Sequence, residues 1–207
     1  MTPNKVIIGV TGNSGSGKGT VCTILQNMGG FCIDADQLAH EVMEYGHSAY
    51  TEISEMFGAG ILASDGSIDR RKLGDIVFHD PVKRKALEHI VHTHVKQKFR
   101  RLTDAALEKK TAFVVWDAPL LAEADMHKSC NLVLLVTAPF ITKLKRITNR
   151  DGISEEQALL RLSNQPADDA LYHKLVADIG ETHVKIIENT GSINDLEDKI
   201  YLAVCGD

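Results

Sequence analysis

The chain has 207 residues, 43% of them hydrophobic, so it can bury a sizeable core and is expected to form a single domain over 1–207. No apolar run approaches the roughly 18 residues that a membrane helix needs, and a net charge of −5 argues against general nucleic-acid binding. The four cysteines form no Cys-x-x-Cys pair, which favours reduced thiols and a cytoplasmic location. Nothing in the composition calls for an obligatory protein partner.

Short apolar runs alternate along the chain with longer stretches of helical periodicity. The runs predict strands at 6–10, 31–33, 112–116, 132–137 and 184–187. Helices are predicted at about 17–27, 37–45, 140–149, 154–163 and 193–204. This alternation predicts an α/β fold of three layers, with a five-stranded parallel sheet between helices.

The middle of the chain is basic and helical. Residues 69–110 carry twelve Lys or Arg against six Asp or Glu, a net +6, which leaves −11 for the rest. Apolar residues recur here at helical spacing, and Asp80-Pro81 marks a helix start. We therefore expect a helical insert over about 60–110. Its positive charge either belongs to solvated helix faces or attracts an anionic substrate.

A glycine-rich segment follows the first strand and precedes a helix. The segment begins at Gly12. The residues expected to bind ATP follow it, and they are Asn13, Ser14, Gly15, Ser16, Gly17, Lys18, Gly19 and Thr20. Glycines let the backbone turn so that several N–H groups converge on phosphate oxygens, and the lysine reaches the β- and γ-phosphates. The segment therefore predicts a phosphate-binding loop (P-loop) of a kinase that uses ATP, with Lys18 as a catalytic residue.

The residue after the P-loop lysine is commonly Ser or Thr, whose hydroxyl binds Mg²⁺, but here it is Gly19. Either Thr20 or an ordered water would then take that place. Asp117 ends the third predicted strand, where P-loop folds place an acid that acts on Mg²⁺ through water. The alternative is that Asp117 is a buried or capping residue.

Two acids follow the second predicted strand, at the sheet edge where ligands bind in open α/β folds. A carboxylate there can position an acceptor hydroxyl and accept its proton, and we predict that Asp34 is this general base. Asp36 is expected at the substrate, or alternatively as the cap of the next helix.

Arg146 and Arg150 lie four residues apart on one predicted helix, within an expected lid at 140–165. Such arginines can neutralise charge on a transferring phosphate, and the alternative for each is an exposed ion pair with nearby acids. His89, His92 and His94 are not expected to form a metal site, because no nearby cysteine completes one and the helix faces separate His94 from the other two.

Several motifs, in one order, resemble those of the dephospho-coenzyme A kinases. They are residues 9–18, Ile33-Asp34-Ala35-Asp36, Phe57-Gly58, residues 65–70, Phe78-His79-Asp80-Pro81, residues 87–92, residues 117–123 and residues 146–151. The resemblance implies ATP- and Mg²⁺-dependent phosphorylation of the ribose 3′-hydroxyl of dephospho-coenzyme A. It also implies that the helical insert helps to form the acceptor pocket, with Arg70 and His92 in it, and it agrees with Asp34 as base.

The chain departs from the family pattern at Gly19, at His92-Thr93, where His-Pro is usual, and at residues 45–48, and residues 166–183 align poorly. Without a proline at position 93, the helix is expected to continue through it. Two other functions compete with this interpretation. One is a kinase for nucleoside monophosphates or sugars, and the other is an ATP-bound regulatory switch.

Overall fold

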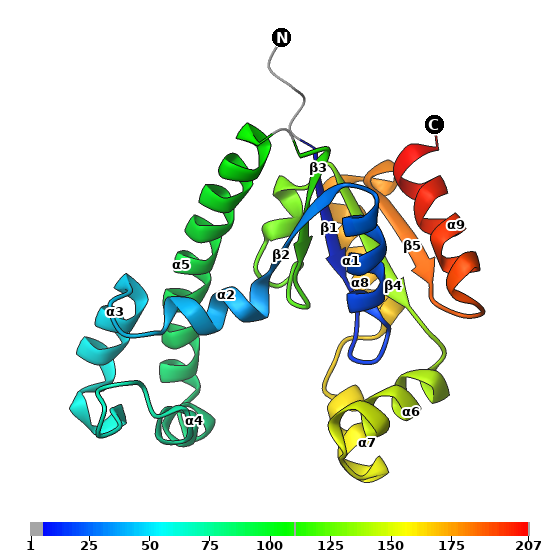
Figure 1. The fold of residues 1–207 in the computed structure, drawn as a ribbon. Coiled ribbons are helices and arrows are strands. Elements are labelled where there is room, and N and C mark those ends of the chain that lie inside the picture. The colour runs from blue at the N-terminus through cyan, green and yellow to red at the C-terminus, as the bar shows by residue number, and fades with distance from the viewer. Residues whose placement is uncertain (1–5, 110, 207) are drawn as a thin grey trace. The chain divides into compact units, whose positions relative to one another are not determined.

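The structure is a computed structural model that describes residues 6–109 and 111–206 (Figure 1). A five-stranded parallel sheet has the order β2-β3-β1-β4-β5, and helices surround it, which confirms the predicted α/β class. The strands are β1 (Ile7–Thr11), β2 (Gly30–Asp34), β3 (Phe113–Asp117), β4 (Leu132–Thr137) and β5 (Val184–Glu188). All five lie within about two residues of the predicted runs.

The chain divides into two compact units. The sheet unit comprises Met1–Ile33 and Ala105–Asp207, and the helical unit comprises Asp34–Asp104. The predicted insert at 60–110 therefore overlaps a unit that already begins at the end of β2.

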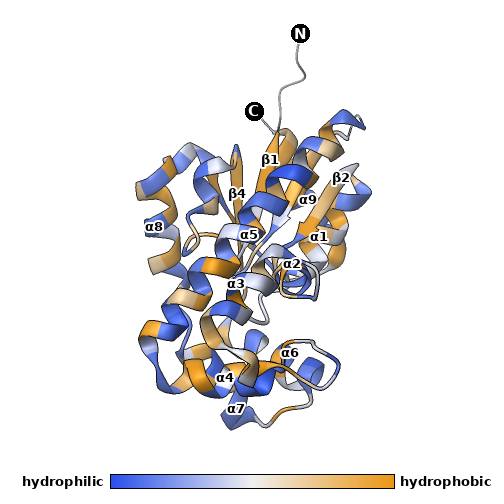
Figure 2. Cartoon of the chain, turned by 90° about the vertical axis from the view of Figure 1, so that its left-hand side faces the viewer, coloured by the Kyte–Doolittle hydropathy of each residue, from blue (hydrophilic) through white to orange (hydrophobic). Residues whose placement is uncertain are grey.

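The central strand β1 shows why these runs become buried strands. Ile8 and Val10 are almost fully buried on one face, against α1 (Lys18–Asn27) and α9 (Ile193–Cys205). Gly9 faces the other way, where a Cβ would come 2.6 Å from Cδ2 of Leu121. In Figure 2 the strands are accordingly among the most apolar parts of the chain. The packed sheet holds the carboxyl ends of the strands in place, and in open α/β folds the ligand site lies at these ends.

A helix that the sequence did not predict packs beside β5. It is α8 (Asp168–Ile179), which contacts β5 through a short stripe that includes the buried Leu171 and Leu175. Two short 3₁₀ helices, Met126–Ser129 and Glu181–His183, contact the same helix.

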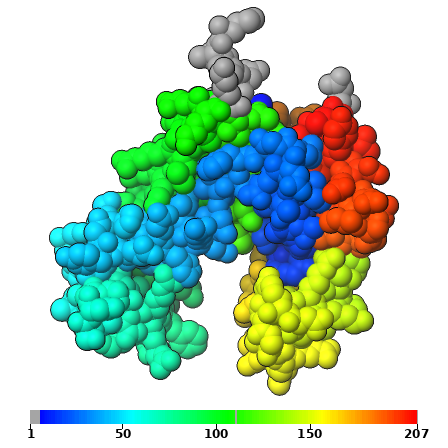
Figure 3. Space-filling view, in the orientation of Figure 1, coloured from blue at the N-terminus to red at the C-terminus, as the bar shows by residue number. Residues whose placement is uncertain are grey.

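The predicted lid is a pair of helices with a small core of its own. These are α6 (Phe140–Asp151) and α7 (Glu155–Ser163), which pack through Leu144, Ile147, Ala158 and Leu162. A capping box between Ser154 and Gln157 starts α7. In the space-filling view these residues project as a yellow lobe next to the blue P-loop region (Figure 3).

The helical unit holds α2 (Ala35–Val42), α3 (Ser48–Phe57), the 3₁₀ helix Ala59–Ile61, α4 (Arg70–His79) and most of α5 (Pro81–Glu108). The sequence predicted that α2 would begin two residues further along the chain, at 37–45, and it did not predict α3 or α4. Asp80 caps α5 by accepting from the N–H groups of Val82 and Lys83, as Asp80-Pro81 predicted. The helix continues through Thr93, whose hydroxyl donates to the carbonyl of His89.

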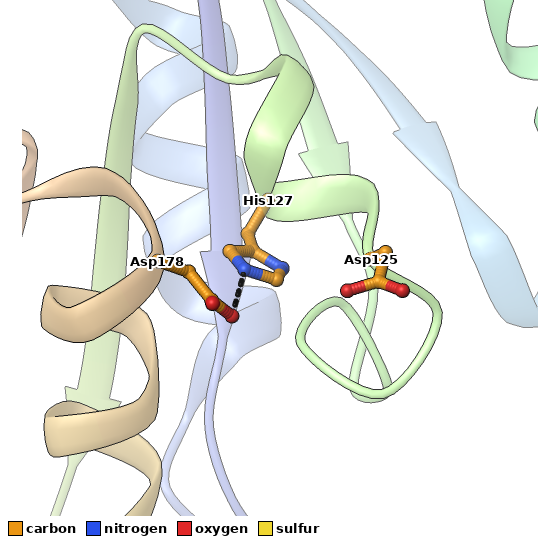
Figure 4. A group of neighbouring side chains, drawn as sticks. All are labelled: Asp125, His127 and Asp178. Carbon is orange, nitrogen blue, oxygen red and sulfur yellow. Dashed lines mark hydrogen bonds and ion pairs between the residues drawn. The ribbon is translucent and has the colours of Figure 1, made fainter.

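A buried histidine ties the segment after β3 to α8 (Figure 4). His127 has a fully buried side chain, and its Nε2 donates to a carboxylate oxygen of Asp178 at 2.9 Å. Its Nδ1 lies 3.3 Å from the carbonyl oxygen of Leu121, while the nearby Asp125 is paired with Lys128. The ring nitrogens are thus occupied within the protein, and we assign this group a structural role.

Within the two described stretches, no helix combines the length and the apolar composition needed to cross a membrane.

Candidate active site

The glycine-rich segment forms a loop between β1 and α1, as predicted. Gly15 and Gly17 have φ values of 76° and 97°, a region that residues with a Cβ rarely enter. The space is closed as well, since a Cβ on Gly15 would overlap the backbone of Lys143, and one on Gly17 would overlap Asn189. These glycines are required both by their dihedral angles and by the elements packed against the loop.

The loop leads into an α-helix whose first turn lacks competing groups. Gly17 is the N-cap of α1, and it has no side chain that could cap the first turn. No acidic residue lies in the first turn. Backbone N–H groups at the positive end of a helix dipole form an anion site, so this geometry suits the phosphates of a nucleotide.

Lys18 begins α1 and turns back over the loop. Its Nζ donates to the carbonyl oxygen of Gly12 at 2.8 Å. An ammonium group has three donors and a flexible stem, so Lys18 can also reach a phosphate bound at the loop.

Arg146 on α6 contacts the loop directly. Its Nη1 donates to the carbonyls of Gly15 and Ser16 at 3.3 and 3.1 Å, and its Nη2 donates to the carbonyl of Asn189. Asn189 follows β5 and donates from Nδ2 to the carbonyl of Ser16 at 2.8 Å. Asn189 was not among the predicted site residues, although Asn-Thr-Gly directly after a strand indicates a turn at the ligand-binding edge.

Beside these two residues lies a cavity of about 260 Å³. Its lining comprises Gly17, Thr20, Arg146, Asn189, Gly191, Ser192, Ile193 and Leu196. The walls combine backbone and polar groups with two apolar side chains, and the cavity opens at the start of α1. A flat, partly apolar group attached to a phosphate chain would suit it.

Gly19 is exposed on the first turn of α1. A Cβ built there meets no atom within 4 Å, so no packing contact excludes a serine. Thr20 is also exposed, and it lines the cavity. The departure at Gly19 therefore removes a hydroxyl without changing the space available to one.

Asp117 ends β3, opposite Val10 of β1, as the sequence predicted. One of its carboxylate oxygens is buried. The pKa of the Cys22 thiol on α1 is raised, first by its hydrogen bond with Cys32, then by burial, and further by the negative charge of Asp117. Cys22 and Cys32 are both free thiols, as the sequence predicted. A thiol that is held protonated is a poor nucleophile, so we assign Cys22 a packing role.

Asp34 is the last residue of β2 and the N-cap of α2. Its Oδ1 accepts from the N–H groups of Asp36 and Gln37 at 2.8 and 3.0 Å. The alternative role of Asp36 as the helix cap is wrong, because Asp34 caps α2. Carboxylates have two oxygens, so capping through Oδ1 leaves Oδ2 for another contact.

Two further predicted residues lie in the helical unit. Arg70 begins α4 and contacts the ring of His40 on α2. His92 is half-buried on α5, and this burial lowers its pKa below the usual value for histidine. Lys83 and Arg84, in the basic stretch, form exposed ion pairs with Asp80 and Glu88.

Arg150 differs from Arg146. It pairs with Asp151 through Nε and Nη2 at 2.7 and 3.0 Å, and Arg161 pairs with the same carboxylate. Arg150 first, and Arg161 in addition, hold the pKa of Asp151 down at about 2. The exposed ion pair given as the alternative is thus present at Arg150, whereas Arg146 contacts the loop.

Comparison with known proteins identifies the family. The family model for dephospho-CoA kinase matches residues 6–195. The chain belongs to the dephospho-CoA kinase family. A dephospho-CoA kinase of Bacillus licheniformis is 38% identical over 196 residues, which cover 95% of this chain and 94% of the relative. One from Shouchella clausii is 37% identical, over 95% of this chain and 96% of the relative.

Solved structures agree with membership in the dephospho-CoA kinase family. The dephospho-CoA kinase from Campylobacter jejuni has a TM-score of 0.65 at 27% identity, over 96% of this chain and 94% of that one. TT1252 from Thermus thermophilus has a TM-score of 0.74 at 34% identity, over 93% of both chains. The expectation of an ATP-dependent kinase of this family is confirmed.

Proposed function

We propose that the chain transfers the γ-phosphoryl group of ATP to the ribose 3′-hydroxyl of dephospho-coenzyme A at the glycine-rich loop. Family membership supports the reaction, which completes coenzyme A biosynthesis. The observation that carries the proposal to these residues is the uncapped first turn of α1 behind Gly17, with Lys18 folded over the loop. Backbone N–H groups and one ammonium there would hold the β- and γ-phosphates.

Asp34 would act as the general base. Phosphoryl transfer needs a group that positions the acceptor hydroxyl and takes its proton as the new O–P bond forms. Asp34 ends a strand at the ligand-binding edge, and its capping contacts orient the carboxylate through Oδ1. In the reaction the hydroxyl oxygen bonds to phosphorus, its proton passes to Asp34, and ADP leaves.

The cavity beside Arg146 and Asn189 would take the adenine base. Its position at the start of α1 fits a base joined to phosphates on the loop, and its mixed polar and apolar lining fits a heteroaromatic ring. Arg146 would form one wall. Its guanidinium would contact the adenine while it donates to the loop carbonyls of Gly15 and Ser16.

The residues present fit Mg²⁺, which prefers oxygen ligands and retains several waters. The donors available are the carboxylate of Asp117, at the end of β3 opposite Val10, and the hydroxyl of Thr20. Asp117 would act through water. When bound, the ion would neutralise charge on the β- and γ-phosphates.

The acceptor would be bound by the helical unit, residues 34–104. Arg70 is exposed beside Arg71 and Lys72 at the start of α4, and its guanidinium would supply several N–H donors to the diphosphate of dephospho-coenzyme A. Because the pKa of His92 is lowered, its imidazole is neutral at neutral pH. A neutral imidazole can both donate and accept a hydrogen bond. Asp36, exposed on the first turn of α2, remains a candidate for contact with the acceptor.

A panel of acceptors tests this proposal. We expect ADP release from ATP to depend on dephospho-coenzyme A and to be far slower with nucleoside monophosphates or simple sugars. Faster turnover with one of those compounds would assign a different acceptor. ADP release that needs no acceptor would favour the regulatory switch.

A further inference from the structure

The segment between α7 and α8 contacts two residues of the P-loop, Asn13 and Ser14. The backbone N–H of Ser14 donates to the side-chain oxygen of Gln165 at 3.0 Å. The side-chain amide of Asn13 donates to the carbonyl of Pro166 at 2.9 Å. Both contacts join residues more than 150 positions apart in the chain, so they form only in the folded sheet unit.

A second set of contacts holds Asn13 from the same side. Its Nδ2 also donates to Oδ1 of Asp168, at 2.7 Å. The other carboxylate oxygen of Asp168 accepts from Nζ of Lys143 at 2.9 Å. Asn13 is 7% exposed, and the side chains of Lys143 and Asp168 are 9% and 22% exposed. Hydrogen bonds to charged groups are stronger when partly shielded from water, so this chain of contacts fixes the Asn13 side chain.

These contacts give the lid segment (140–165) an attachment to the loop at both ends. At its start, α6 packs its Lys143 backbone against Gly15, and Arg146 donates to the loop carbonyls. At its end, Gln165 accepts from Ser14. The lid segment therefore contacts the loop at Ser14, through Gln165, and at Gly15 and Ser16, through α6.

We propose that Gln165 and Asp168 are positioning residues for the P-loop, which hold Ser14 and Asn13 in the conformation that binds phosphate. A glycine-rich loop loses much conformational freedom on ordering, and contacts that order it beforehand increase the affinity for its ligand. The inference rests on the proposed function only in that the loop binds the phosphates of a nucleotide.

Gln165 alone could be interpreted in the opposite way. Its amide oxygen occupies an N–H of the P-loop, so it would compete with a phosphate oxygen for Ser14. Competition does not account for the contacts of Asn13, which use a side-chain amide and a partly buried ion pair. The two interpretations predict changes of opposite sign, because a brace increases nucleotide affinity and a competitor decreases it.

Calorimetric titration with ADP distinguishes them. Gln165→Met keeps the length of the side chain and removes the acceptor, and we expect the Kd for ADP to rise about three- to tenfold, the size of one net hydrogen bond. Asp168→Ala should raise the Kd at least as much. Asp168→Asn, which keeps an oxygen for Asn13, should restore part of the loss. Asp169→Ala is the matched control, since Asp169 is the exposed neighbour of Asp168 in α8.

Steady-state kinetics separates positioning from a general loss of structure. For Gln165→Met we expect KM for ATP to rise while KM for dephospho-coenzyme A and the thermal midpoint stay at the wild-type values. An unchanged or lower Kd for ADP in Gln165→Met would overturn the inference and leave the proposed function intact. If the wild-type chain did not bind ADP, the inference and the proposed function would both be wrong.

Discussion

At the scale of single residues, Asp34 combines two roles that one substitution can separate. Asparagine caps helices as well as aspartate does, so Asp34→Asn should keep the contacts to Asp36 and Gln37 and leave the thermal midpoint unchanged. It removes the proton acceptor, so kcat should fall about 100- to 10,000-fold with the Kd for ATP preserved.

The contrasting variant is Lys18→Ala. It acts on the nucleotide side, so it should weaken ATP binding as well as turnover. A near-normal kcat for Asp34→Asn would remove Asp34 as the base.

The glycine after the P-loop lysine offers a gain-of-contact experiment. Gly19→Ser places a hydroxyl where a Cβ meets open space, and serine is better than glycine in a helix by about 0.5 kcal/mol. We expect the variant to be slightly more stable and to reach half-maximal activity at a lower Mg²⁺ concentration, as measured by a Mg²⁺ titration at saturating ATP. A higher Mg²⁺ requirement would mean that the serine hydroxyl does not assist the metal.

Some residues of the site could be predicted from the sequence, and others could not. The P-loop glycines, Lys18 and the end of β3 at Asp117 were predicted because each has a local signature. For Asn189 the local signal is weak, since Asn-Thr-Gly after a strand indicates a turn but does not show what the amide contacts. It reaches Ser16 only because β5 and β1 lie in one sheet, on either side of β4.

Among the helices, the link between the segment after β3 and α8 depends on His127. Removing the imidazole leaves a cavity and an unpaired Asp178, so His127→Ala should lower the free energy of unfolding by about 2–3 kcal/mol. Denaturant unfolding followed by circular dichroism measures this change. Lys128→Ala is the control one residue away, and removal of its exposed pair with Asp125 should have no measurable effect. Equal effects of the two substitutions would contradict the structural role of His127.

In the lid, the pairing of Asp151 with Arg150 and Arg161 predicts a dependence on pH. The pKa of Asp151 is about 2 in the folded chain, and an unfolded aspartate has a pKa of about 3.9. A lowered pKa means that the stabilisation is present above pH 4 and is lost as the pH falls from about 4 through about 2. We expect wild type and Asp151→Asn to differ in unfolding free energy at pH 5 and to converge near pH 2. A difference that does not vary with pH would contradict this assignment.

The elements that the sequence missed share a physical reason. The five strands are continuous apolar runs and were all predicted, whereas α8 buries only a short stripe that includes Leu171 and Leu175. α4 has Leu73 as its one buried residue in the helix. Such stripes are too short to show helical periodicity, and α8 also has no capping side chain at its start.

For the whole molecule, the loop alone identifies a phosphate site, and the order of several motifs identifies the reaction. The family match spans residues 6–195 and so includes both the sheet unit and the helical unit. The assignment of the acceptor therefore rests on the helical unit as much as on the loop, since other P-loop kinases share the loop.

The most direct test follows the transferred phosphate. The chain is incubated with ATP labelled in its γ-phosphoryl group, Mg²⁺ and dephospho-coenzyme A, and the product is analysed by mass spectrometry and phosphorus NMR. We predict one labelled phosphate per product molecule, on the ribose 3′-oxygen, in a yield equal to the ADP formed. Label that is found as free phosphate or at another position, or transfer that proceeds unchanged with Lys18→Ala, would contradict the account.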